Sequence, residues 1–151
     1  MKIFIATDHR GVDTVKKIVS YLKSLEIDIT ESKIEHNDLD DYPDFAFDVC
    51  KNVLNNPGSL GILVCGTGIG MSIAANKVKG IRAARCTSVD DAYYSKCHNC
   101  ANVLCIGMNT PLETIFEMID TFINTKYPDE EKHLRRVDKI IKYESGTYNE
   151  L

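Results

Sequence analysis

Short runs of apolar, often β-branched residues alternate along the chain with longer stretches in which apolar positions recur at helical spacing. The short runs cover residues 2–6, 27–34, 61–64, 81–86 and 101–106. The last helical stretch covers about residues 129–143. Such alternation is typical of βαβ units on a parallel sheet. The pattern therefore predicts an α/β fold, a doubly wound three-layer (αβα) Rossmann-like domain with a five-stranded parallel sheet and a C-terminal helix.

Local signals support the helical stretches between these strands. Pro43 stands where the first turn of a helix begins, and Ser88 with Asp91 has the spacing of a capping box. A third helix is expected from about residue 71 to 77, directly after a glycine-rich segment.

The length and composition fit one soluble domain spanning residues 1–151. The chain has 44% hydrophobic and 26% charged residues and a formal net charge of -4. Lys and Arg are spread along the sequence, which argues against a nucleic acid or an acidic membrane as the main partner. No stretch resembles a signal peptide, and none approaches the roughly 18 apolar residues of a membrane span. We expect a cytoplasmic protein.

Six cysteines are present, and in a domain of this size within a reducing compartment we expect them to be free thiols. Cys97 and Cys100 have the spacing of half a zinc site, but the only nearby cysteines, Cys86 and Cys105, lie in expected buried strands. The sequence therefore predicts no metal site and no cofactor.

In a doubly wound sheet, ligands bind beyond the carboxyl ends of the strands. Polar residues at those ends are Asp8 and His9 after the first strand, Cys65 and Thr67 after the third, and Asn109 after the fifth. His98, just before the fifth strand, is a further candidate, and we expect it near the same edge of the sheet as His9.

The segment after the third strand suits an anion. Gly66, Gly68 and Gly70 let the backbone approach a ligand and direct amide N–H groups at it beside a helix N-terminus. The spacing is not a nucleotide-binding fingerprint, and no P-loop lysine is present. At the mouth of this loop Cys65 is expected to favour the thiolate and to act as base or nucleophile. The alternative is a small buried hydrophobic residue at a strand end.

Basic residues cluster on the expected C-terminal helix. Lys132 and Arg136 are four residues apart and His133 lies on the neighbouring arc, so the three side chains can converge on one anion. Arg135 points elsewhere. The alternative is a solvated basic face.

These features occur together with longer motifs, namely Asp8-His9, Asp41-Tyr42-Pro43-Asp44, residues 65–77, His98-Asn99, and His133 with Arg136-Val137-Asp138. Across nearly the whole chain they resemble the type B ribose-5-phosphate isomerases, a family that also includes the galactose-6-phosphate isomerase subunits.

The resemblance implies an aldose–ketose isomerase without metal or cofactor, acting in the non-oxidative pentose phosphate pathway. A histidine matching His98 opens the sugar ring, and a cysteine matching Cys65 moves a proton between carbon 2 and carbon 1. The remaining site residues follow from the family's motifs. The enediolate would be stabilised by the Thr67 side chain, by Asn99 and by backbone amides of the loop Gly66, Thr67, Gly68, Ile69 and Gly70. The sugar would be held by Asp8 and His9. The phosphate would be bound by Lys132, His133 and Arg136.

The family's phosphate site is shared between two subunits. The resemblance therefore implies a homodimer or a dimer of dimers, with the C-terminal helix packing on a partner subunit. The expected ligand is a small phosphorylated sugar.

Several positions depart from the family pattern. Lys132 and Asn109 stand where arginine is usual, whereas Arg10 replaces a usual alanine and Arg85 a usual apolar residue. Our hypothesis is that Arg10 or Arg85 restores the lost charge, or that the pocket accepts a different sugar. Together with Tyr42, Arg10, Arg85 and Asn109 are possible site residues.

Three functions remain open at this point. The first is an isomerase of ribose 5-phosphate and ribulose 5-phosphate. The second is an isomerase of a six-carbon sugar phosphate such as allose or galactose 6-phosphate. The third is a non-catalytic phosphosugar-binding module, which would not need Cys65, Thr67, His98 and Asn99 together.

Overall fold

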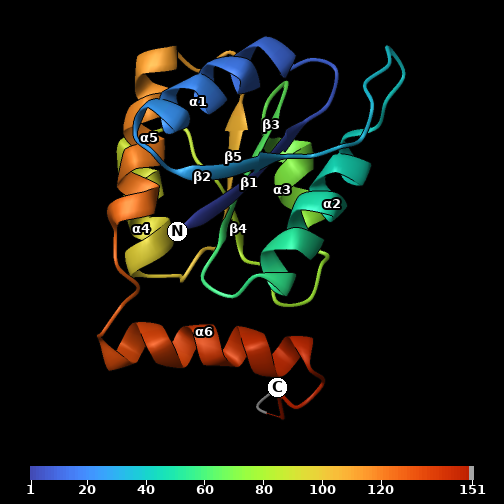
Figure 1. Ribbon diagram of the computed structural model, residues 1–151. Coiled ribbons are helices and arrows are strands. Elements are labelled where there is room, and N and C mark those ends of the chain that lie inside the picture. The colour runs from blue at the N-terminus through green and yellow to red at the C-terminus, as the bar shows by residue number, and fades with distance from the viewer. Residues whose placement is uncertain (150–151) are drawn as a thin grey trace.

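A computed structural model describes residues 1–149 and has the predicted α/β architecture (Figure 1). Within these residues one sheet of five parallel strands is present, in the order β2-β1-β3-β5-β4. The strands are β1 (Lys2–Thr7), β2 (Asp28–Glu31), β3 (Leu60–Cys65), β4 (Ala83–Arg85) and β5 (Val103–Gly107). The helices are α1 (Val12–Ser24), α2 (Tyr42–Asn55), α3 (Ile69–Ala75), α4 (Val89–Cys97), α5 (Leu112–Asn124) and α6 (Glu131–Glu144).

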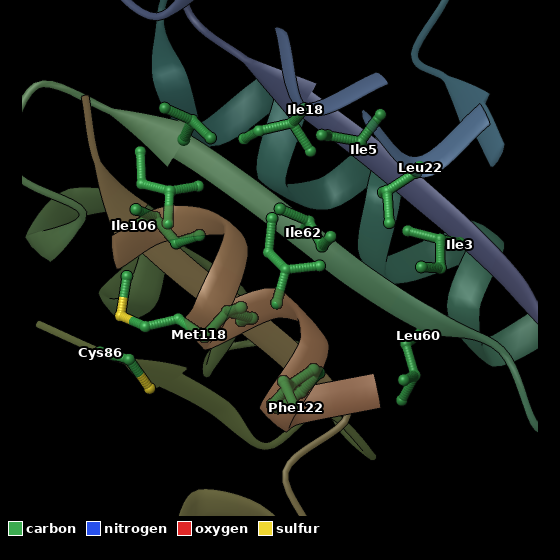
Figure 2. Packing of buried hydrophobic residues seen from close by; sticks show 14 of the residues in the cluster. Ile3, Ile5, Ile18, Leu22, Leu60, Ile62, Cys86, Ile106, Met118 and Phe122 are labelled. Atoms are coloured by element: carbon green, nitrogen blue, oxygen red, sulfur yellow. The ribbon is translucent and has the colours of Figure 1, made fainter. Parts of the chain in front are cut away.

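Helices cover both faces of the sheet and make two separate cores. Helices α1, α4 and α5 lie on one face, and α2 and α3 lie on the other (Figure 1). Figure 2 shows the first core, where strand residues meet side chains of α1 and α5. The labelled residues are Ile3, Ile5, Leu60, Ile62, Cys86, Ile106, Ile18, Leu22, Met118 and Phe122. Because β3 is buried on both faces, its uniformly apolar sequence is explained by its central place.

The order of the strands fixes where a ligand can bind. From β1 the chain passes through α1 to β2 on one side, whereas β3 lies on the other side of β1. The winding direction therefore reverses between β1 and β3, and the loops that follow these two strands diverge at the carboxyl edge of the sheet. Those loops carry His9 and Cys65, two of the candidates predicted from the sequence.

Several element bounds differ from the predicted ones for physical reasons. Helix α3 begins at Ile69 rather than 71, because Gly68 takes a left-handed conformation and its carbonyl accepts the Ser72 N–H. Strand β4 is shorter than the predicted run 81–86. The amide side chain of Asn76 both donates to and accepts from the backbone of Ala83, which covers the outer edge of that strand.

The second and fifth strands and the last helix also have slightly different limits from the runs 27–34, 101–106 and 129–143 that the sequence predicts. The capping site at Ser88 is present, since its hydroxyl accepts the Asp91 N–H.

In the described part of the chain, no helix has both the length and the apolar character that crossing a bilayer requires.

Helix α6 lies across the end of the domain, away from the carboxyl edge of the sheet (Figure 1). It is attached through the buried side chains of His133 and Val137 and through the Glu144 carboxylate, which accepts the Gly80 N–H at 3.0 Å. Three other apolar residues of this helix are exposed by nearly half, namely Leu134, Ile140 and Ile141. The helix therefore leaves most of its apolar side uncovered.

Candidate active site

Cys65 is the last residue of β3 and is almost fully buried. The Gly68 N–H donates a hydrogen bond to its Sγ at 3.2 Å. This contact depends on Gly68 itself, which has φ 75°. A Cβ there would stand 3.0 Å from the Ile106 carbonyl carbon and 3.1 Å from the Gly107 nitrogen. Close contact with strand β5 therefore restricts the loop 65–70 to a conformation in which the Gly68 N–H points at the sulfur.

Two guanidinium groups flank the same loop. The Arg85 Nε donates to the Thr67 carbonyl oxygen at 2.9 Å. Arg10 lies over Gly66, where an added Cβ would stand 3.0 Å from its Nη1. Both arginines are exposed. The two arginines that depart from the family pattern therefore both lie beside the loop that begins at Cys65.

The other predicted residues of this edge also border the loop. The Tyr42 ring packs on Gly70, leaving only 2.7 Å between its Cζ and a Cβ built there. Asp8 is buried and accepts the Arg10 N–H at 3.1 Å. Asn109 is exposed in the turn after β5, next to Met108, whose N–H donates to the Cys65 carbonyl.

His9 makes a contact that the sequence did not reveal. Its Nδ1 lies 2.7 Å from Asp40 Oδ1, and the second carboxylate oxygen lies 2.8 Å from the Nδ1 of His36. The hydrogen bond to Asp40, opposed by partial burial, raises the pKa of His9 from 6.5. Although burial alone would raise the pKa of Asp40, hydrogen bonds from His9, His36 and the backbone lower it to about 2. The i, i+4 spacing of His36 and Asp40 was the one available signal.

His98 and His133 form a second cluster. His98 caps the end of α4, and its ring stacks on that of His133 with centroids 4.0 Å apart. Burial, the neighbouring His98 and the cations of Lys132 and Arg136 lower the pKa of His133, against the carboxylate of Glu130. The three basic residues of α6 therefore do lie together, although Lys132 also forms an ion pair with Glu130 at 2.7 Å.

The expectation that His98 lies near the same edge as His9 was wrong. His98 precedes β5 rather than following it, and parallel strands all begin at one edge of a sheet and end at the other. His98 and Asn99 therefore lie at the amino-terminal edge, and Cys65 at the carboxyl edge. The length of β3 between those edges is roughly 17 Å at the usual rise per residue.

The described residues contain neither a disulfide nor a cluster of side chains that could hold a metal ion. All six cysteines are free, and burial raises the pKa of Cys50 and of Cys86 to about 12. Among residues 1–149, no group of three or more His, Cys, Asp or Glu side chains is arranged to hold a metal ion, and this includes Cys97 and Cys100.

Known proteins resemble this chain over nearly its whole length. The Ribose/Galactose Isomerase family matches residues 3–140. A protein of Mycoplasma genitalium called probable ribose-5-phosphate isomerase B is 45% identical, with 96% of this chain and 97% of the relative covered. Ribose-5-phosphate isomerase B of Mycobacterium tuberculosis is 35% identical, with 95% of this chain and 90% of the relative covered.

Solved structures show the same fold. Ribose-5-phosphate isomerase B of Clostridium thermocellum superposes with a TM-score of 0.91 at 38% identity, covering 97% of this chain and 99% of the other. The Mycoplasma genitalium enzyme with bound ribulose-5-phosphate has a TM-score of 0.88 at 40% identity, covering 95% and 96%. From its sequence, its sheet order and the loop at Cys65, this chain belongs to the ribose/galactose isomerase family.

Proposed function

We propose that the protein interconverts ribose 5-phosphate and ribulose 5-phosphate by proton transfer through an enediolate. The observation that carries the proposal is the buried Cys65 thiol with the Gly68 N–H on its sulfur, within a loop bordered by cationic side chains. A donor directed at sulfur stabilises a thiolate more than a thiol. The relatives named ribose-5-phosphate isomerase B, one of them with bound ribulose-5-phosphate, support this choice of substrate.

Each group has a defined part in the reaction. The Cys65 thiolate takes the proton from carbon 2 of the open-chain aldose, and the electron pair forms the bond between carbons 1 and 2 while oxygen 1 becomes the oxyanion. A proton then passes from oxygen 2 to oxygen 1, the electron pair left on oxygen 2 forms the ketose carbonyl, and carbon 1 takes the proton back from the Cys65 thiol, which returns to thiolate. Preorganised amides of residues 66–70 and the Thr67 hydroxyl stabilise the negative charge of the intermediate.

A single chain does not bring all of these groups together. Cys65 lies at one edge of the sheet, whereas His98, Asn99 and the basic residues of α6 lie at the other. We therefore propose a homodimer in which the Cys65 edge of one copy faces the His98 edge of the other. In that arrangement His98 of the second copy opens the ring, and its Lys132 and Arg136 bind the phosphate.

The uncovered side of α6 supports this assembly. Leu134, Ile140 and Ile141 are exposed next to the buried Val137, and apolar surface of this kind is stabilised by burial against another chain. Packing of α6 on the partner would bring its basic residues to the partner's Cys65 edge.

Cytoplasmic location, predicted from the sequence, stays a prediction.

The test is a coupled assay of five- and six-carbon aldose and ketose phosphates, with and without a chelator. We expect turnover of ribose 5-phosphate that the chelator leaves unchanged. Loss of activity on chelation would contradict the metal-independent mechanism, and no turnover of any substrate would favour the binding module.

The role of Cys65 is tested separately with Cys65→Ala. This variant should lose solvent proton exchange at carbon 2, with a fall in kcat of roughly 10²- to 10⁴-fold, while binding of ribose 5-phosphate persists. Cys50→Ala is the matched control, because burial in the core of α2 keeps that thiol protonated and it should leave kcat unchanged. Exchange retained in Cys65→Ala would assign the base to another residue.

A six-carbon substrate is the second candidate, and one observation favours it. Arg10 and Arg85 both border the loop beside Cys65, where they add bulk and positive charge. A higher kcat/KM for allose or galactose 6-phosphate than for ribose 5-phosphate in the same assay would establish it.

A further inference from the structure

The carboxylate of Asp40 links two histidines at the carboxyl edge of the sheet. It accepts the backbone N–H of His9 at 2.9 Å and lies 2.7 Å from the Nδ1 of the same residue. Its other oxygen lies 2.8 Å from the Nδ1 of His36. The Asp40 side chain is only 5% exposed, whereas the two imidazoles are 38% and 37% exposed. The acid is thus covered by the two rings that it binds.

The segment that carries Asp40, residues 32–41, is itself fastened to the core. The His36 ring stacks on Phe45, with centroids 4.9 Å apart and an interplanar angle of 13°. Phe45 is 1% exposed within the α2 side of the domain. The Ser32 hydroxyl also donates to the Asp48 carboxylate at 2.6 Å. A continuous series of contacts therefore runs from the buried face of α2 through His36 and Asp40 to His9.

We propose that Asp40, held by His36, is a positioning residue that keeps His9 protonated and fixes its ring orientation for binding the anionic sugar phosphate. The inference rests on the proposed function and names a residue that acts through His9. With Nδ1 bound to Asp40, Nε2 is the ring nitrogen left for a ligand. His9 lies two residues beyond Thr7, which pairs with Val64 near the end of β3, so the backbone at His9 lies at the same edge of the sheet as the Cys65 loop.

The electrostatic surroundings of His9 agree with this role. The facing groups are the carboxylates of Asp40 and Asp8, with the neighbouring Arg10 on the same segment and His36 across Asp40. The hydrogen bond to Asp40 is the main cause of the raised pKa of His9, and the charge of Asp8 adds to it. At a pH between the ordinary pKa of 6.5 and this raised pKa, His9 keeps its proton only while Asp40 is charged.

The test compares Asp40→Asn with Asp38→Asn, a matched loss of charge in the same loop. The C2 proton of His9 is titrated by NMR in each protein, and KM for ribose 5-phosphate is measured from pH 5.5 to 8.5. In Asp40→Asn we expect a lower pKa of His9 and a KM raised roughly tenfold or more above pH 6.5, as for the loss of one hydrogen bond to a charged group. Below that pH the difference should shrink, because His9 is then protonated in both proteins. Asp38→Asn should match the parent.

An unchanged titration of His9 in Asp40→Asn, or a KM ratio that is the same at every pH, would overturn the proposal. If Asp40→Asn does not fold, Asp40→Ser is measured in its place, with the same two expected results. The NMR titration needs no turnover, so a failure of the isomerase assay in the parent protein is distinguishable from a failure of this coupling.

Discussion

Two independent constraints act on Gly68. Its φ of 75° lies in the left-handed region, and a Cβ there would meet backbone atoms of β5 at 3.0 and 3.1 Å. Gly58 has a similar φ of 83°, but nothing lies within 4 Å of a Cβ built on it. Substitutions at Gly58 and Gly68 therefore separate the free-energy cost of the left-handed conformation from the free-energy cost of steric crowding.

We predict that Gly58→Ala lowers the free energy of unfolding by about 1 kcal/mol and leaves kcat unchanged. Gly68→Ala should cost at least about 1 kcal/mol more and should also lower kcat, because the N–H on the Cys65 sulfur moves. Urea unfolding and steady-state kinetics measure both effects. Equal losses of stability in the two variants, with normal kcat, would contradict this account of the loop.

Arg10 is the second residue for which the surroundings make a specific prediction. Its exposed guanidinium lies over Gly66, so its positive charge stands next to the Cys65 loop. We expect Arg10→Ala to raise KM for the preferred phosphosugar by roughly tenfold or more, as for loss of a charge-assisted hydrogen bond. Arg135→Ala, on the exposed face of α6, should have no comparable effect. An unchanged KM for every active phosphosugar would refute a role for Arg10 in binding.

At the scale of single residues, the sequence was most informative where the signal is local. Cys65 and the glycines after it are adjacent in the chain, so their chemistry could be interpreted without knowing the fold. Asp40 and His36 were missed because their contact with His9 depends on how the segment after β2 returns to β1. His98 was assigned to the wrong edge because its position before the strand was not distinguished from one after it.

At the scale of elements, one side-chain contact links two neighbouring helices. The Tyr21 hydroxyl of α1 donates to the Asp120 carboxylate of α5 at 2.5 Å, and its ring stacks on Phe116. This hydrogen bond raises the pKa of Tyr21 to about 12. Since the phenol keeps its proton longer in the folded chain, the contribution is complete below pH 10 and is lost as the pH rises from 10 towards 12.

Tyr21→Phe keeps the stacked ring and removes only the hydroxyl, so it tests this link directly. We expect the free energy of unfolding at pH 7 to fall by about 1 kcal/mol. In a double-mutant cycle with Asp120→Ala, the two changes should be strongly non-additive. Strictly additive losses would mean that the hydroxyl and the carboxylate do not stabilise each other.

Element order and sheet type followed from the alternation of apolar runs and helical periodicity, and the structure confirms both. The ends of elements were less predictable, because they depend on tertiary partners. The Asn76 amide limits β4, and the left-handed Gly68 starts α3 two residues early. The fate of the last helix was also unpredictable, because Val137 is buried in the single chain whereas Leu134, Ile140 and Ile141 are nearly half exposed.

At the scale of the whole molecule, the two halves of the proposed site lie at opposite edges of one sheet. A two-fold dimer joins each half to the complementary half of its partner and so forms two equivalent sites. The exposed apolar residues of α6 give such a dimer a surface to bury. Family membership fixes the fold and the reaction class, whereas the division of the site between two chains is a proposal that the family resemblance implies and the topology supports.

Mixing two inactive variants tests that division most directly. Cys65→Ala and His98→Ala, carrying different affinity tags, are purified, mixed under conditions that allow subunit exchange, and shown by tandem purification to form hybrids. Each hybrid dimer contains one site with both residues intact, so the mixture should recover roughly a quarter of the parent activity on ribose 5-phosphate. Hybrids that form but remain as inactive as either variant alone would contradict a site shared between two chains.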